Sequence, residues 1–108
     1  MNDAQYQKYL PLTEATYYIL LALVEPLHGY AIMQKVEKIS QGTVTIGPGT
    51  LYGAFTTLEK DGLIQMLSEQ DRRKTYALTP LGRSLLAGQI HRLEIMTTNG
   101  QAVLPALE

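Results

Sequence analysis

The chain has 108 residues and a mass of 12.0 kDa, which suits one domain built round a single hydrophobic core. Nine Lys and Arg residues against ten Asp and Glu residues leave a net charge of −1, so the bulk charge does not indicate a polyanionic partner. The absence of cysteine excludes disulfides, thiolate catalysis and cysteine-based metal sites. The chain shows no signal-peptide pattern and no apolar run of the roughly 20 residues that span a bilayer, so we expect a cytoplasmic protein.

The first part of the chain predicts a short arm and one very apolar helix. Residues 1–11 carry Tyr6 and Tyr9, which is apolar for a chain end and suits an arm that packs on a partner surface. Thr13 is a favourable helix cap, and apolar side chains follow it at helical spacing. Pro26 ends this helix, which we expect at the centre of the core.

Two further helices are expected before any strand. The second covers Gly29 to Ser40, and its inward face is expected to be Ile32, Met33, Val36 and Ile39. The third starts at Pro48, because proline suits the first turn of a helix, and it closes at Asp61-Gly62. Its inward stripe is Leu51, Ala54, Phe55 and Leu58.

The apolar period then changes from that of a helix to that of strands. Residues 63–67 and 75–78 predict two strands, and the polar residues 68–74 between them predict a loop, which together give a β-hairpin. Thr79-Pro80 predicts the start of a last helix, with its end near Thr98 because Asn99-Gly100 follows. The apolar stripe of this helix is Leu86, Ile90, Leu93 and Met96.

Three helices, a hairpin and another helix, in that order, are the plan of a winged helix-turn-helix. The fold class is therefore expected to be mainly α with a small β-hairpin. We assign residues 1–79 to a winged helix-turn-helix domain with a short N-terminal arm. Residues 80–108 are assigned to a C-terminal dimerisation helix, the whole forming a single compact unit. In such a fold the third helix can enter a major groove while the hairpin reaches the flanking backbone or minor groove.

Five segments of the chain carry a more specific signal through their order and spacing. They are Leu12 through Leu23, His28-Gly29-Tyr30, Gly49-Thr50-Leu51-Tyr52, Leu58-Glu59-Lys60-Asp61-Gly62-Leu63-Ile64 and Asp71-Arg72-Arg73-Lys74-Thr75-Tyr76-Ala77-Leu78-Thr79-Pro80-Leu81-Gly82-Arg83. The fourth segment alone is common among winged helices, whereas the combination of the second, third and fifth is specific. Together they resemble the PadR family of bacterial transcriptional regulators over residues 12–83. The short tail after Gly82 is similar to the subgroup with one C-terminal helix.

This resemblance implies a homodimeric repressor whose C-terminal helices form much of the dimer contact. Such proteins bind a palindromic operator in double-stranded DNA, and a small aromatic or cationic effector often relieves repression. The resemblance also places His28 in a turn where we expect it to bond the local backbone. No catalytic constellation, metal site or cofactor is indicated, since neither His28 nor His91 has a second ligand at a suitable spacing.

The candidate DNA-binding residues lie on the second helix, the third helix and the hairpin. Thr50 and Tyr52 supply hydroxyls in the family's Thr-Leu-Tyr motif, and threonine can bond bases or touch a thymine methyl. Family members commonly carry arginine or lysine at the positions of Gly53 and Thr57, so specificity is expected to depend on threonine, backbone contacts and DNA shape. The full set is Lys35, Lys38, Pro48, Gly49, Thr50, Tyr52, Gly53, Thr56, Thr57, Lys60, Arg72, Arg73 and Lys74.

The last helix is the candidate dimer interface, because an unpaired apolar face would promote aggregation and a symmetric dimer covers it. The interface set is Tyr6, Tyr9, Leu86, Ile90, Leu93 and Met96, and the ligand-binding set drawn from it is Tyr6, Tyr9 and Met96. An alternative reading is a winged-helix protein-interaction module that does not bind DNA, which the uncharged outer face of the third helix favours. The charged hairpin tip is equally open to a plain solubilising role, because Glu69 and Asp71 adjoin its cations.

Overall fold

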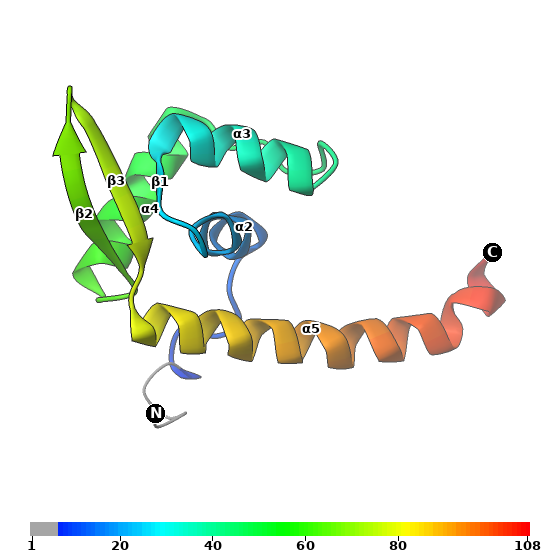
Figure 1. Ribbon diagram of the computed structural model, residues 1–108. Coiled ribbons are helices and arrows are strands. Elements are labelled where there is room, and N and C mark those ends of the chain that lie inside the picture. Colours follow the sequence, from blue (N-terminus) through cyan, green and yellow to red (C-terminus); the bar gives the residue numbers. More distant parts are fainter. Residues whose placement is uncertain (1–6) are drawn as a thin grey trace.

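The computed structural model describes residues 7–108, so Tyr6 lies outside the described residues. Within them the chain forms four helices and a three-stranded antiparallel sheet with strand order β1-β3-β2 (Figure 1). The elements are α2 (Glu14–Ala22), β1 (Leu27–His28), α3 (Gly29–Ile39), α4 (Pro48–Lys60), β2 (Ile64–Gln70), β3 (Arg73–Leu78) and α5 (Pro80–Leu107). The expected fold class, a mainly helical winged helix with a small sheet, is confirmed.

Helix α2 is the centre of the core, as its composition predicts. It starts after Thr13, whose hydroxyl oxygen accepts a hydrogen bond from the Thr16 backbone N–H at 3.2 Å. Ile19 and Leu20 are fully buried, and the helix lies between α3 and α5 (Figure 1). A helix that is apolar on nearly every side needs such a position, because water would otherwise meet one of its apolar faces.

Helix α3 begins directly after β1, a strand that the sequence did not predict. Its N-cap is His28, whose Nδ1 accepts a hydrogen bond from the Ala31 backbone N–H at 3.5 Å, so the expected local bond of this histidine is confirmed. Ile32 and Val36 are buried as expected. Ile39 is exposed instead, because it is the last residue of the helix and lies beyond the elements that cover its neighbours.

Helix α4 has the expected bounds and inward face. Pro48 stands in its first turn, and Gly62, with φ +76°, takes the left-handed conformation that ends it. Leu51, Phe55 and Leu58 are buried. The N-cap is Gly47, which has no side chain to bond the first backbone N–H groups, so these groups open to the surface.

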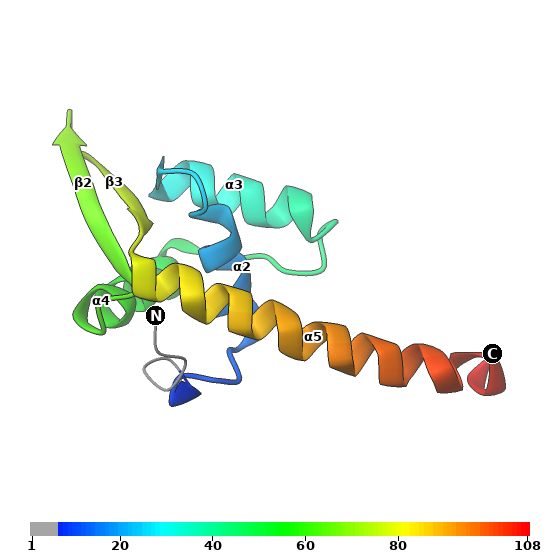
Figure 2. The same cartoon turned by 60° about the horizontal axis from the view of Figure 1, so that its bottom comes forward.

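The β-hairpin, hereafter the wing, is longer than expected. The predicted loop over residues 68–74 is wrong, since β2 and β3 extend through it and leave Asp71 and Arg72 as a two-residue turn. Both turn residues have positive φ, 52° and 68°, as the favoured tight hairpin turns require. Polar side chains alternate along these strands because both faces of the wing tip meet solvent, which hid the strand signal. Figure 2 shows the wing projecting away from the helices.

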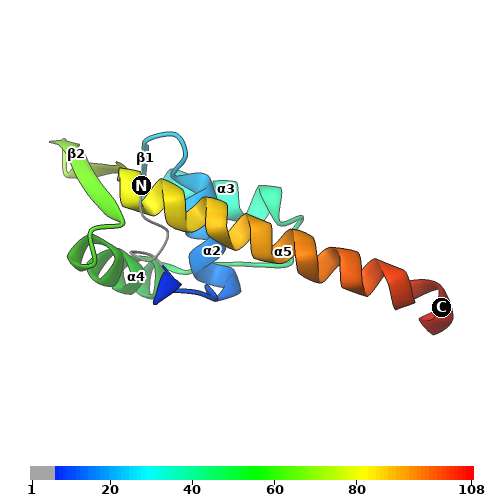
Figure 3. The ribbon, with the colours of Figure 1, turned by 90° about the horizontal axis from the view of Figure 1, so that it is seen from below.

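Helix α5 is also longer than expected, and the predicted end near Thr98 is wrong. Thr79 caps it, accepting from the Gly82 backbone N–H at 3.1 Å, and the helix continues through Asn99-Gly100 to Leu107. A single glycine costs a helix only about 1 kcal/mol, which does not stop a segment whose apolar pattern continues. The first turns pack on the domain, and the remainder extends well beyond it (Figures 1 and 3). No helix within residues 7–108 is long and apolar enough to cross a membrane.

Candidate nucleic-acid interface

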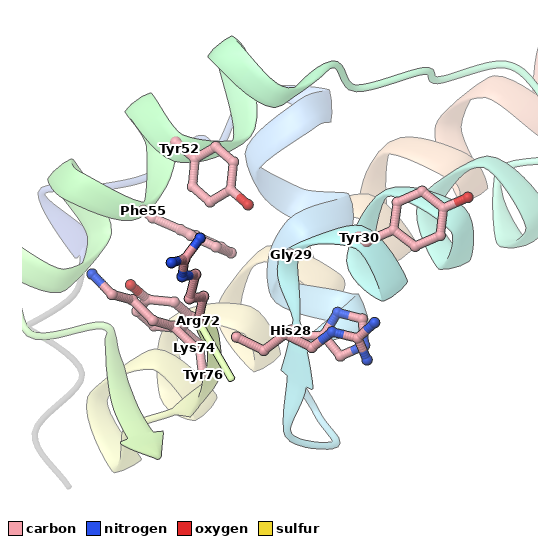
Figure 4. A pocket seen from close by; sticks show the side chains of 9 residues that line it. His28, Gly29, Tyr30, Tyr52, Phe55, Arg72, Lys74 and Tyr76 are labelled. Atoms are coloured by element: carbon pink, nitrogen blue, oxygen red, sulfur yellow. The ribbon is translucent and has the colours of Figure 1, made fainter. Parts of the chain in front are cut away.

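A pocket of about 310 Å³ lies where the wing, α3 and α4 meet. Its lining comes from three separate parts of the chain, namely His28, Gly29 and Tyr30 before and in α3, Tyr52 and Phe55 in α4, and Arg72, Arg73, Lys74 and Tyr76 in the wing. Figure 4 shows Arg72 reaching from the wing toward Tyr52 and Phe55. The pocket therefore combines cationic side chains, a phenol hydroxyl and the N-terminal end of a helix. Each of these groups attracts an anion.

The approach of α3 to α4 in this pocket depends on Gly29. A Cβ atom at this position would stand 2.9 Å from the hydroxyl of Tyr52 and 3.3 Å from the side chain of Leu51. Glycine removes this obstacle, so the Tyr52 hydroxyl lies against the first turn of α3 while 55% of the Tyr52 residue stays exposed. Tyr52 thus belongs to the pocket and not to the core.

The wing supplies three cations without neutralising partners. Among residues 7–108 the single ion pair within 4.0 Å is His91–Glu94, far from the wing, so Glu69 and Asp71 do not pair with the adjacent cations. Lys74 alternates with Tyr76 and faces α4, whereas Arg73 also borders the opposite face of the wing beside His28 and Thr75. The cations therefore present positive charge on both faces of the wing.

The position of Arg72 carries a conformational cost. Its φ of 68° lies in the left-handed region, where residues other than glycine lose about 1–2 kcal/mol. Glycine or asparagine would satisfy the same turn at lower cost. Strain of this kind persists where function holds it, so the observed outlier favours a role for the Arg72 side chain.

The outward face of α4 is small and nearly uncharged. Gly49 and Gly53 have no neighbouring atom within 4 Å of an added Cβ, which leaves the backbone open to close approach. The hydroxyl of Thr56 donates a hydrogen bond to the Tyr52 carbonyl at 3.1 Å, so this hydroxyl is available to an external partner only as an acceptor. Lys60 is the one cation on the helix, in its last turn.

Several of the predicted residues lie apart from the pocket. The Lys35 ammonium group donates to the carbonyl of Ala22 at 3.3 Å, at the end of α2, and is thereby occupied within the domain. Lys38 stands in the last turn of α3, at the end of that helix opposite the wing. Gly53 and Thr57 border a different groove, on the other flank of α4, together with Tyr9 of the arm.

The predicted dimer and ligand residues are also divided. Leu86 is 5% exposed and belongs to the core of its own domain, whereas Met96 is 62% exposed on the free part of α5. Met96 and Leu93 border a groove of about 510 Å³ between α2 and α5, which Tyr17 and Tyr18 also line. Tyr9 packs on the core and lines the groove beside α4, so the structure does not bring Tyr9 and Met96 into one pocket.

The sequence reasoning missed the part that β1 and β3 play in the pocket. Two residues of β1 pair with Thr75 and Tyr76, which fixes the start of α3 against the wing. Tyr76 lies under the cations with its ring 4.4 Å from that of Phe55. Burial, and secondarily the nearby Glu59 carboxylate, raises the pKa of the Tyr76 hydroxyl, which therefore stays neutral. The His-Gly-Tyr segment was the one signal that pointed here.

Comparisons with known proteins agree with this geometry. The model of the family described as "Transcriptional regulator PadR-like family" matches residues 19–88. An uncharacterised 37.1 kDa protein of transposon TN4556 from Streptomyces fradiae is 42% identical over 81 residues, which cover 74% of this chain and 23% of that protein. The chain thus spans about a quarter of the length of this curated relative.

Two solved structures share the fold over most of the chain. A transcriptional regulator from Clostridium thermocellum superposes with a TM-score of 0.71 at 25% identity, covering 94% of this chain and 96% of that one. A PadR-like transcription factor from Bacteroides fragilis superposes with a TM-score of 0.67 at 28% identity, covering 82% and 88% of the two chains.

Proposed function

The chain belongs to the PadR-like family of transcriptional regulators, and from this premise we propose that it binds a palindromic operator as a homodimer and represses transcription. The observation that carries the proposal is the convergence of Arg72, Arg73 and Lys74 with Tyr52 and the start of α3 in one pocket, with no carboxylate paired to the cations. A phosphate of the DNA backbone is the ligand that this set of donors suits.

The two parts of the surface divide the work of recognition. In this proposal the pocket holds the backbone and sets the position of the protein, while α4 lies in the major groove and contacts bases. The open N-terminal turn of α4, from Pro48 to Thr50, offers backbone N–H groups to a second phosphate. Thr56 accepts hydrogen bonds from base amino groups and presents its methyl to thymine.

Close backbone approach supplements these few side-chain contacts. Gly49 and Gly53 leave α4 without bulk on its outer face, so the helix axis comes nearer to the base edges than an arginine-bearing helix does. Sequence preference then depends on van der Waals fit and on DNA shape, together with threonine contacts. Nonspecific affinity is correspondingly modest, because few phosphates are neutralised outside the wing.

The same uncharged face supports one competing function. A winged helix with a neutral, small-residue α4 is suited to binding another protein, and Lys60 alone would carry positive charge into such an interface. This second candidate leaves the three unpaired wing cations without a role, which is why we favour DNA.

Dimerisation and ligand response are assigned to α5. We divide the chain into a winged domain up to residue 79 and a dimerisation helix over residues 80–108, whose first turns remain part of the core. A small aromatic or cationic effector fits the groove between α2 and α5, where Tyr17 and Tyr18 supply rings, Met96 an adaptable side chain and Glu14 a carboxylate. A thermal-shift titration with tetraphenylphosphonium tests this site, since Glu14→Gln should weaken that binding and no shift in the wild type would refute it.

Fluorescence anisotropy of a labelled duplex from upstream of the gene tests the DNA-binding proposal. Lys74→Gln should weaken binding several-fold, because Lys74 faces the pocket. Lys8→Gln removes the same charge from the arm, on the opposite flank of α4 from the wing (Figure 3), and should leave affinity unchanged. Absence of binding by the wild type, or equal losses in both variants, would overturn the proposal.

A further inference from the structure

The free part of α5 continues the packing face of its first turns. Residues at alternating spacings of four and three run along one side of the helix, namely Gly82, Leu86, Gln89, Leu93, Met96, Gly100, Val103 and Leu107. This heptad spacing is the pattern of a helix–helix seam. Gly82, Leu86 and Gln89 are buried against the domain, whereas Val103 is 54% and Leu107 75% exposed. Half of the seam is thus covered within the chain, and the described residues leave the other half open.

The open half needs a cover to remain helical. Residues 95–107 contain no charged side chain, so no ion pair along the helix supports them. They also contain Gly100 and Pro105, two residues that weaken a helix interior. Isolated helices of about 12–15 residues are marginal in water even with favourable sequences. Packing of the apolar side is what would hold this segment in the helical form.

We propose that the free half of α5 pairs antiparallel with the same segment of a second copy, and that the two helices cross near Gly100. This inference rests on the proposed homodimer and specifies its geometry. An uncharged segment pairs with its own copy without like-charge repulsion, which a strongly charged helix does not. Glycine at the crossing lets the two backbones approach closely.

The direction of pairing follows from where the domain sits. The rest of the domain packs on the seam side of α5, at its N-terminal end. A parallel partner on the open seam would bring its own domain into the space that the first domain occupies. An antiparallel partner places the two domains at opposite ends of the helix pair. Residues at equal distances from Gly100 then approach each other, so Leu93 of one copy meets Leu107 of the other at the rim of the groove between α2 and α5.

Cysteine cross-linking in the full chain tests this geometry directly, because the wild-type protein has no cysteine. Gly100→Cys should form a disulfide-linked dimer under mild oxidation, since a disulfide requires Cα atoms about 4.4–6.8 Å apart. Leu107→Cys should not link to itself, because antiparallel pairing separates its two copies. Ile95→Cys, on the opposite side of the helix, is the exposed control. A Leu107→Cys dimer without a Gly100→Cys dimer would overturn the proposal in favour of parallel pairing.

Sedimentation measurements complete the test. Val103→Asp should shift the protein to monomer, whereas Ile95→Asp, at a residue that is 64% exposed off the seam, should not. A monomeric wild type, or equal effects of the two substitutions, refutes the pairing. Binding of the Val103→Asp monomer to a half-site duplex keeps the two proposals distinct. Failure of even the wild type to bind DNA would count against the proposed function and not against the dimer.

Discussion

Replacing Arg72 by glycine should change stability and DNA binding in opposite directions. Arg72 holds a left-handed φ of 68° in a two-residue turn, so glycine relieves about 1 kcal/mol of backbone strain. The same change removes one of three wing cations from the pocket. Each phosphate contact contributes about 0.9 to the slope of log affinity against log salt concentration. The salt slope should therefore flatten by about 0.9 per protomer.

The size of the binding effect follows from this slope. Between about 50 and 200 mM salt, the wild type should lose roughly 3.5-fold more affinity than the variant per protomer, and roughly 12-fold more for a dimer. Fluorescence anisotropy across a salt series measures this difference, and urea denaturation measures the gain in unfolding free energy.

Two controls separate charge from conformation. Arg72→Lys keeps the charge and the strain, so it should preserve both the slope and the stability. Lys8→Gln removes a charge outside the pocket and should leave the slope unchanged. If Arg72→Gly leaves the slope as steep as in the wild type, Arg72 does not contact phosphate. If its stability does not rise, the left-handed turn is not strained, and the case for a functional Arg72 loses that support.

Three further substitutions test the fold that holds the site. Gln89→Ala should cost about 2 kcal/mol in urea denaturation, because the buried Gln89 carbonyl accepts from the Leu12 backbone N–H at 3.1 Å, whereas the exposed Gln101→Ala should cost little; equal losses would contradict this role. Gly82→Ala should cost about 3 kcal/mol, because its Cβ would overlap the Leu63 carbonyl, whereas Gly53→Ala has open space; a fully stable Gly82→Ala would refute that packing. Burial raises the pKa of Tyr76 above the usual 10.0, so the folded state retains its proton longer than the unfolded state, and stability present below pH 10 should fall above it. Tyr76→Phe should make this fall in alkaline denaturation shallower, and an unchanged pH profile would contradict it.

The helices were predictable because their signals are local. Thr13 and Thr79 cap helices as expected, and Asp61-Gly62 ends α4 where expected. These features depend on side chains within a few residues of each other. The apolar stripes of α2 and α4 likewise face the core, since each is long enough to show its period.

The errors arose where tertiary structure overrides local signals. The two residues of β1 are too few to show alternation and form a strand only by pairing with β3. The wing tip is polar on both faces, so its strands resembled a loop. The end of α5 was misplaced because Asn99-Gly100 is a stop signal only when no apolar seam continues past it.

The pocket itself was beyond the sequence. It joins Gly29, Tyr52 and Arg72, which lie on three separate elements, and no spacing along the chain shows that they meet. The separation of Tyr9 from Met96 had the same origin, since both are aromatic or adaptable residues near chain ends and only the packing of the arm assigns them to different grooves.

The most direct test of a sequence-specific DNA-binding protein is its preference among duplexes. Dissociation constants for the DNA upstream of its own gene and for a shuffled duplex of equal length and composition should be measured at one fixed salt concentration. We expect the upstream DNA to bind at least about 10³-fold more tightly, the lower end for specific regulators. Equal affinity for the two duplexes would contradict operator recognition and leave the winged domain as a module for a protein partner.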